Sequence, residues 1–387
     1  MTPASTVICT VGTSLLRTQI GRLSTLSRPL DAVEQRLLAA LDVHDWESMA
    51  DALEEFSPSD VRCGAEVNSL HLMRSQVRVA ADPRIVLMIS DTDYGRQTGS
   101  ILGLLLPRFG FSSVELCTIV GLTDADPQVF RRIGLRSLAR EICTTIRNYG
   151  SEFCAINATG GYKAQIAIAV TIGQAARVPV YYKHELFNDI ISFPPMPVAF
   201  DFSLWLKHSN LLAMLADVDQ LSLKQLAADA DDVTEQSDEI ESLIDFESFD
   251  GDTYVALSPT GQIVHETFRH QFQRDCSRLL PPIARQKLSC RMKGDESHLR
   301  RYHDELMRFM DRIRDDSPYV VSCHSDYFNP DLPSQPRFRI KAGKIRVMYS
   351  GGTWSAGIVV ETDRSATTEQ LQALCYVLNE SLVAFHT

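Results

Sequence analysis

Six short apolar runs, rich in β-branched residues, recur through the first 200 residues and constrain the fold more than any other feature of the chain. They lie at 6–11, 85–90, 114–120, 153–158, 178–182 and 190–193. Helical patterns fill the segments between them, and this alternation is typical of a parallel sheet covered by helices. Because the runs are apolar almost throughout, we expect strands that are buried on both faces. The sequence therefore predicts a multidomain α/β protein whose residues 1–200 form a parallel sheet with flanking helices.

Three of these runs end in polar or glycine-containing sequence, and open sheets bind ligands at the carboxyl ends of their strands. The three junctions are VGTSLL (11–16), SDTDYGRQTGS (90–100) and NATGGYK (157–163). In the last, Gly160 and Gly161 can bring a phosphate close to backbone N–H groups at the start of a helix, and Lys163 adds a positive charge. A P-loop is excluded, because that motif needs Ser or Thr directly after its Lys, and Ala164 follows Lys163. The alternative is a glycine pair that serves close helix packing.

Composition limits the number of domains and the kinds of partner. At 387 residues with 44% hydrophobic content the chain is too long for one ordinary core, and we expect three domains. The formal charge of -11 means that any contact with nucleic acid needs a local basic patch. The 9 cysteines form no C-x-x-C pair, which predicts no zinc site and favours a reducing cytoplasm. No signal-peptide or membrane-span pattern is found, so we expect a soluble cytoplasmic protein.

Residues 201–288 have the outline of a winged helix-turn-helix. Short helical patterns are followed there by TYVALSPTGQIV, whose Pro259-Thr260-Gly261 is typical of a hairpin turn. From 225 to 268 acidic residues accumulate, and there is no Lys or Arg at all. Duplex phosphates repel a module of this charge, so we expect a connector or dimerisation element that does not bind DNA.

Residues 289–387 form the third expected domain. A helical pattern over 298–315 precedes a stretch, 337–361, that predicts three strands, and a final helix starts at 367. Turns between the strands are expected at Ala342-Gly343 and Gly351-Gly352. This order of elements predicts a small α+β domain.

The first predicted hairpin of that domain holds the strongest basic patch in the chain. Arg337, Arg339 and Lys341 alternate with apolar residues and therefore share one face, and Arg346 follows on the partner strand. This is either a solvated sheet face or a face that cleaves RNA without a metal. Guanidinium groups can stabilise charge on a phosphate but are poor proton acceptors, so a base would have to be Lys341, a His or a Tyr.

The segment RFRIKAGKIRVMY, followed by AGIVVETDR, resembles the RelE family of ribosome-dependent mRNA interferases, which cut messenger RNA in the ribosomal A site without a metal. The resemblance implies catalytic roles for Arg337, Arg339, Lys341, Arg346, Tyr349 and Arg364. Beyond Arg364 the chain departs from the family, because SATTEQ stands where some members carry a catalytic Tyr. The base is therefore open between Tyr349, Lys341 and His298.

The three N-terminal junctions, in their order, resemble a CARF domain, the Rossmann-type sensor of cyclic oligoadenylates in type III CRISPR defence. The resemblance implies a ligand pocket lined by Gly12, Thr13, Ser14, Arg96, Thr98, Asn157, Thr159, Gly160, Gly161 and Lys163. Some CARF proteins also cut their ligand slowly, which Ser14 and Lys163 would do here by orienting the 2′-hydroxyl and stabilising the phosphate. A pocket that only binds is the alternative.

The full order of sensor, winged helix and RelE-like domain resembles the CRISPR-associated mRNA interferases. It implies cyclic tetra-adenylate as the allosteric activator, a homodimer, the ribosome and messenger RNA as partners, and no metal or cofactor, membrane or DNA contact. Two other classes stay open. Arg291 and His298 satisfy the R-x4-6-H spacing of a HEPN ribonuclease acting on free RNA, and a transcriptional regulator would use the winged helix on DNA.

Overall fold

The computed structural model describes 3–196, 201–216, 218, 220–224, 226, 240, 242–249, 251–292, 302–329, 337–350 and 355–382. The chain groups into two compact units. Unit 1 comprises Met1–Phe200 with Leu257–Thr267, and unit 2 comprises Asp201–Ala256 with Phe268–Thr387. The three domains expected from the sequence, 1–200, 201–288 and 289–387, stay a prediction.

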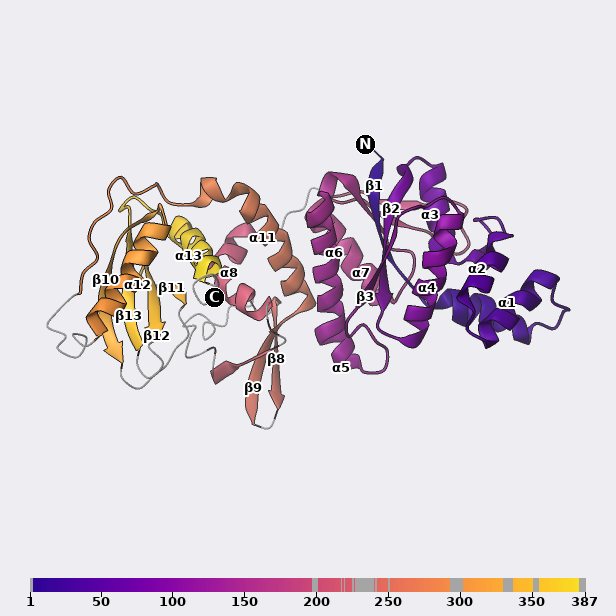
Figure 1. The fold of residues 1–387 in the computed structure, drawn as a ribbon, viewed down its shortest axis with the longest axis horizontal. Helices are drawn as coiled ribbons and strands as arrows, with labels where there is room; N and C mark the ends of the chain where they lie inside the picture. The colour runs from indigo at the N-terminus through magenta and orange to yellow at the C-terminus, as the bar shows by residue number, and fades with distance from the viewer. Residues whose placement is uncertain are drawn as a thin grey trace. The chain divides into compact units, whose positions relative to one another are not determined.

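Unit 1 is built on one six-stranded sheet, in the order β3-β2-β1-β4-β5-β6 (Figure 1). All neighbouring strands are parallel except β5 and β6, which are antiparallel. The strands are β1 (Ala4–Thr10), β2 (Val79–Ser90), β3 (Val114–Ile119), β4 (Cys154–Asn157), β5 (Val180–Tyr182) and β6 (Ile191–Phe193). Each of the six predicted runs is a strand of this sheet, so the prediction of a mainly parallel sheet is confirmed.

Helices cover both faces of this sheet. They are α1 (Ala32–Asp42), α2 (Trp46–Glu54), α3 (Ala65–Ser75), α4 (Asp93–Arg108), α5 (Pro127–Val129), α6 (Leu135–Tyr149) and α7 (Lys163–Ala176). Along β1, Val7 and Cys9 join the apolar cluster that includes α1 to α4, while Ile8 joins the cluster that includes α6 and α7. Successive side chains of a strand point to opposite faces, and here both faces are buried, as the continuous apolarity predicts.

Unit 2 begins with α8 (Phe202–Ala216) and a three-stranded sheet, β7-β9-β8, made of β7 (Leu221–Ser222), β8 (Ile244–Phe249) and β9 (Asp252–Leu257). The hairpin turn predicted at Pro259-Thr260-Gly261 is wrong, because Pro259 starts α11 (Pro259–Leu279). The Ser258 hydroxyl accepts a hydrogen bond from the Gly261 N–H at 3.0 Å, and proline is well tolerated in a first helical turn. The hairpin lies instead between β8 and β9, beside Gly251 with φ +81°.

Much of the acidic run, 227–239, lies outside the described residues. The winged helix therefore stays a prediction. Among the described residues, no helix combines the length and the apolar character that crossing a membrane requires.

The rest of unit 2 is an antiparallel sheet flanked by α12 (His303–Asp316) and α13 (Thr368–Leu382), with strand order β10-β13-β12-β11. Its strands are β10 (Val320–Asn329), β11 (Phe338–Lys341), β12 (Lys344–Ser350) and β13 (Ser355–Thr362). The predicted turn at Ala342-Gly343 is confirmed, with φ of 51° and 70°. The turn at Gly351-Gly352 and the residue His298 lie outside the described residues. The strand β10 was not predicted from the sequence.

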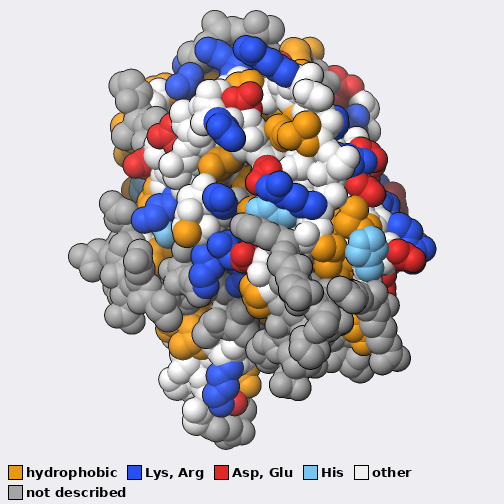
Figure 2. Space-filling model, turned by 90° about the vertical axis from the view of Figure 1, so that its left-hand side faces the viewer, with side chains coloured by type: hydrophobic (Ala, Val, Ile, Leu, Met, Phe, Trp, Pro, Cys, Tyr) orange, Lys and Arg blue, Asp and Glu red, His pale blue; other side chains and the backbone are white. Residues whose placement is uncertain are grey.

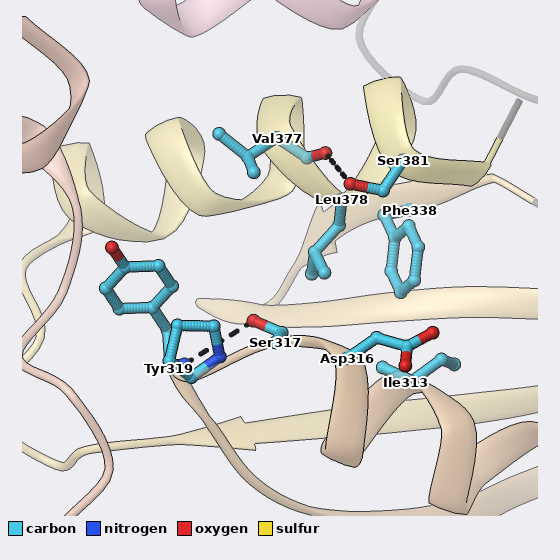
Figure 3. A pocket seen from close by; sticks show the side chains of 9 residues that line it. Ile313, Asp316, Ser317, Tyr319, Phe338, Val377, Leu378 and Ser381 are labelled. Atoms are coloured by element: carbon cyan, nitrogen blue, oxygen red, sulfur yellow. Dashed lines mark hydrogen bonds between the residues drawn. The ribbon is translucent and has the colours of Figure 1, made fainter. Parts of the chain in front are cut away.

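One side of this sheet packs against α12 and α13. A pocket of about 80 Å³ lies on that side, where the end of α12, β11 and α13 meet (Figure 3). Ile313, Phe338 and Leu378 line it, one from each element. Residues that alternate with Phe338 along β11 therefore face the other, polar side of the sheet.

Candidate ligand site and candidate RNA-binding face

The loops that follow β1 and β4 meet at the carboxyl edge of the parallel sheet. β1 lies between β2 and β4, which is the kind of position where open sheets form a ligand crevice. The Thr10 hydroxyl donates to the Gly160 carbonyl at 2.6 Å. A Cβ added to Gly12 would lie 2.8 Å from the Gly161 nitrogen, and one added to Gly160 would lie 2.8 Å from the Gly12 nitrogen. The glycines are therefore required for the contact of the two loops, whether or not a ligand binds.

A buried carboxyl group supports this loop contact from below. Glu66, on α3, has no exposed surface, and its Oε1 accepts a hydrogen bond from the Gly12 N–H at 2.8 Å. Its Oε2 has no hydrogen-bond partner among the described residues. Desolvation by burial raises the pKa of Glu66, partly offset by the Gly12 N–H. The Gly12 N–H is thus directed into the protein and away from any ligand.

The raised pKa of Glu66 leads us to expect that the stability of the protein depends on pH. The carboxyl group of Glu in an unfolded chain has a pKa of about 4.3. Because the folded pKa of Glu66 is higher, the folded state keeps a proton that the unfolded state has released, and stability falls as the pH rises through this interval. We expect Glu66→Gln, which cannot ionise, to gain free energy of unfolding relative to the wild type between about pH 4 and about pH 7. Urea unfolding across this range measures the difference, with the exposed Glu185→Gln as control. A constant difference would contradict the prediction.

Several of the predicted pocket residues have partners inside the protein. Asn157 is buried, and its amide donates to the Ser69 hydroxyl at 2.8 Å while its oxygen accepts from the Thr159 hydroxyl at 2.6 Å. Thr98 is also buried and donates to the Tyr94 carbonyl at 2.7 Å. These contacts give Asn157 and Thr98 structural roles beneath the loops.

The remaining predicted residues are more accessible. Thr13 and Ser14 are half-buried in the loop after β1, and Lys163 is exposed at the first residue of α7. Arg96 is exposed and is held by the carboxylates of Asp91 and Asp93, at 2.8 and 2.7 Å. The structure thus brings the β1 and β4 junctions together directly, and it pairs Arg96 within its own segment.

Four residues that the sequence did not single out link these junctions. Arg17, which follows the β1 loop, has its guanidinium carbon 5.4 Å from the centroid of the Tyr94 ring, at the start of α4. The same guanidinium lies 3.9 Å from the carboxylate of Asp124, which also hydrogen-bonds the Tyr162 hydroxyl. Tyr94 and Tyr162 both lie inside the motifs quoted above, and each stands next to a glycine. An aromatic residue beside a glycine in these motifs was the sequence signal that could have identified them. A cation and two aromatic rings suit a nucleotide ligand.

On unit 2, the register of the antiparallel sheet places the predicted basic residues on one face. Arg339 on β11 lies directly opposite Arg346 on β12. Arg346 in turn lies opposite Val359 on β13, and Val359 lies opposite His324 on β10. Directly opposed residues point to the same face. We call the surface formed by this row and its neighbours, Lys341, Lys344, Glu361 and Ser322, the polar face.

An ion pair fixes Arg346 on the polar face. Arg346 forms an ion pair with Asp326 of β10, in which both side chains are about three-quarters buried. Arg339 is half-buried and Lys341 is exposed. Arg337 is half-buried just before β11, and Arg364 is exposed in the turn after β13. The structure therefore groups Arg339, Lys341 and Arg346, and places Arg364 beyond the end of the sheet.

Tyr349 does not join this group. It alternates with Arg346 along β12 and lies on the helix-covered side, where its ring is 4.8 Å from that of Phe309 and its hydroxyl bonds Glu305. Desolvation, and then the Glu305 carboxylate, raise the pKa of Tyr349 to about 12. A phenol of this pKa on the opposite face is not placed to accept a proton beside Arg346.

Carboxylates and histidine interrupt the cationic surface of unit 2. Figure 2, which looks onto the side that carries β10, β12 and α12, shows Lys and Arg side chains interspersed with acidic ones and with His. Among the described residues, no group of three His, Cys, Asp or Glu side chains could hold a metal ion.

Comparison with known proteins bears on unit 1. Residues 61–196 match the family model described as CRISPR-associated protein (Cas_APE2256). The chain is also similar to Can2 from Sulfobacillus thermosulfidooxidans, solved in complex with cyclic tetra-adenylate, at 13% identity and a TM-score of 0.23, over 74% of this chain and 69% of that chain. At that TM-score the likeness supports no further argument. No curated protein matches the chain. The part of unit 1 from α3 to β6 is thus similar to a family of CRISPR-associated proteins.

Proposed function

We propose that this protein is a ribosome-dependent, metal-independent endoribonuclease of type III CRISPR defence, which cyclic tetra-adenylate activates. The observation that carries the nuclease half is the cross-strand pair of Arg339 and Arg346 on one face of a four-stranded sheet. The match of 61–196 to a CRISPR-associated family supports the setting. Unit 1 is the sensor and unit 2 carries the RelE-like nuclease.

The contact between the β1 and β4 loops supports the sensor half. Exposed Lys163 at the start of α7 adds a point charge at the positive end of a helix, and Arg17 with Tyr94 offers a surface on which a base can stack. A cyclic tetranucleotide can have two-fold symmetry, so a homodimer that presents this site twice suits it. Binding would then shift the population toward the active nuclease arrangement. Slow ligand cleavage through Ser14 and Lys163 remains a separate alternative to simple binding.

The chemistry of the polar face supports dependence on the ribosome. Arg339 and Arg346 supply fixed positive charge for a phosphorane-like transition state but do not accept protons at neutral pH. Such a site is slow on free RNA, and docking on a ribosome supplies the alignment of the 2′-hydroxyl, a term worth several powers of ten in rate. The HEPN alternative fits less well, because HEPN domains are all-helical and four strands occupy this part of the chain.

A direct test combines translating ribosomes, a messenger RNA and the protein, with and without cyclic tetra-adenylate. We expect cuts, mapped by primer extension, only when ribosomes and ligand are both present. Equal and codon-independent cutting of free RNA would contradict the dependence on the ribosome. Salt-sensitive binding of random duplex DNA that maps to 201–288 would favour the regulator instead.

The sensor half has its own test in Lys163→Ala. Removing a charge-assisted contact to a phosphate should weaken cyclic tetra-adenylate binding by about 1.5 to 3 kcal/mol, or roughly 10- to 100-fold. Isothermal calorimetry measures the affinity. Arg36→Ala is the control, because Arg36 lies on α1 in an exposed ion pair with Glu55 and should leave binding unchanged. Equal affinity of Lys163→Ala and wild type would remove Lys163 from the site.

A further inference from the structure

The polar face contains a carboxylate to which neither family resemblance gives a role. Glu361 of β13 lies two residues from Val359 and faces the same side as Arg346 and His324. We propose that Glu361 is the general base that takes the proton from the 2′-hydroxyl of the RNA, and that His324 and Ser322 are positioning residues that hold its carboxylate. This inference rests on the proposed nuclease function and identifies the proton acceptor that the arginines cannot provide.

Hydrogen bonds and charges from separate segments hold this carboxylate in place. The Ser322 hydroxyl donates to Glu361 Oε2 at 2.7 Å, and His324 Nε2 lies 3.5 Å from Oε1. Arg291 forms an isolated β-bridge with His324 of β10, and its guanidinium lies 3.9 Å from Glu361 Oε1. The Ser322 hydrogen bond, followed by electrostatic interactions with His324, Arg291 and Lys344, lowers the pKa of Glu361. The group is thus ionised and oriented at neutral pH.

Accessibility separates the roles of Glu361 and His324. The Glu361 side chain is 34% exposed, whereas that of His324 is 4% exposed. The His324 Nδ1 is buried without a hydrogen-bond partner among the described residues. An RNA strand can therefore reach the carboxylate but not the imidazole, which makes His324 a support for Glu361.

The spacing on the sheet suits one phosphodiester and its ribose. Neighbouring strands lie about 4.8 Å apart, and two residues along a strand span about 6.7 Å, so the Cα positions of Arg346 and Glu361 are about 8 Å apart. Long side chains that project from one face over this distance can reach a phosphate and the adjacent 2′-oxygen together. The register thus keeps the charge-stabilising group and the proton acceptor within reach of one phosphodiester.

The proposed step is a transphosphorylation within the RNA. Glu361 accepts the proton of the 2′-hydroxyl, the 2′-oxygen forms a bond to phosphorus, and the bond from phosphorus to the 5′-oxygen breaks. The electron pair of that bond stays on the 5′-oxygen, which takes a proton from water. The products are a 2′,3′-cyclic phosphate and a 5′-hydroxyl, and the proton on Glu361 returns to solvent.

The test measures single-turnover cleavage by the full chain on translating ribosomes with cyclic tetra-adenylate. We expect Glu361→Gln to lower the cleavage rate about 10²- to 10⁴-fold, the contribution of a general base. Affinity for ribosome-bound messenger RNA should stay unchanged. In Glu361→Ala, added formate should restore part of the rate, because a small carboxylate can replace the missing base. If Glu361 only formed a structural ion pair, added formate would not change the cleavage rate of Glu361→Ala.

Three comparisons make the outcome decisive. Glu369→Gln, an exposed acid in the first turn of α13, is the matched control and should cut at the wild-type rate. Ser322→Ala removes only one hydrogen bond to the carboxylate and should slow cleavage more mildly than Glu361→Gln. If the wild type cuts and Glu361→Gln cuts equally fast, the role of Glu361 is refuted while the nuclease function stands. If the wild type itself does not cut, the proposed function fails and this inference with it.

Discussion

Arg346→Ala is expected to lower the rate of RNA cleavage about 10²- to 10³-fold, the usual cost of losing one donor that stabilises transition-state charge. Arg346 occupies the centre of the polar face, between Arg339 on one neighbouring strand and Val359 on the other. Its guanidinium is held by Asp326, so it is fixed before the substrate arrives. A fixed donor stabilises a transition state without reorganisation during the reaction.

The same ion pair makes Arg346→Ala more damaging than Arg339→Ala. Removing Arg346 leaves the partly buried Asp326 carboxylate without its cation, close to where the phosphate would lie. We therefore expect the double variant Arg346→Ala, Asp326→Ala to recover part of the lost rate. Arg339→Ala should lower the rate about 10²-fold, the lower end of the cost of losing one charge-stabilising donor.

Single-turnover cleavage on ribosomes and calorimetry with cyclic tetra-adenylate separate this effect from misfolding. Ligand affinity should be unchanged in both arginine variants, because unit 1 folds around its own core. Arg312→Ala is the control, since Arg312 is an exposed residue on α12, paired with Asp316 four residues away. Wild-type cleavage by Arg346→Ala would show that the polar face is only a solvated sheet surface.

Gly160→Ala should destabilise unit 1 by about 1 to 3 kcal/mol, the range for forcing an extra group into a packed site. The new Cβ would overlap Glu66 Oε1 and lie 2.8 Å from the Gly12 nitrogen. Neither neighbour can move easily, because Glu66 is fully buried and Gly12 belongs to the backbone that Glu66 anchors. We expect the loops after β1 and β4 to separate, so the variant should also lose ligand binding.

Urea unfolding and calorimetry test this prediction, with Gly103→Ala as the matched control. Gly103 lies inside α4, and a Cβ there would meet only the Leu116 side chain at 3.6 Å, an ordinary contact. That change should be neutral or stabilising by about 0.5 to 1 kcal/mol, because Ala suits a helix interior better than Gly. Equal stability of Gly160→Ala and wild type would mean that the loops do not need their close contact.

The pattern of apolar residues predicted secondary structure well where burial makes a short segment apolar throughout. The parallel strands of unit 1 were predictable because both faces are buried, so each strand is a compact apolar run. The turn at Ala342-Gly343 was predictable because Gly343 readily adopts the positive φ that a tight hairpin turn requires. The pattern failed for β10, whose SCHSDY alternates small and polar residues and is a strand because β13 pairs with it. It also failed at Pro259, since proline suits both a turn and a first helical turn.

The sequence by itself determined where the strands of unit 1 lie, that its glycine-containing junctions end strands, and that Arg337, Arg339 and Lys341 alternate with apolar residues. Only the tertiary structure decided what those residues face. Glu66 meets Gly12 from 54 positions away, and Glu361 meets Ser322 and His324 across a strand pair. The register of strands distant in sequence sets such contacts, and burial of the whole core fixes that register. Tyr349 was assigned to the arginines by motif, yet the pleat turns it toward α12 because side chains alternate along β12.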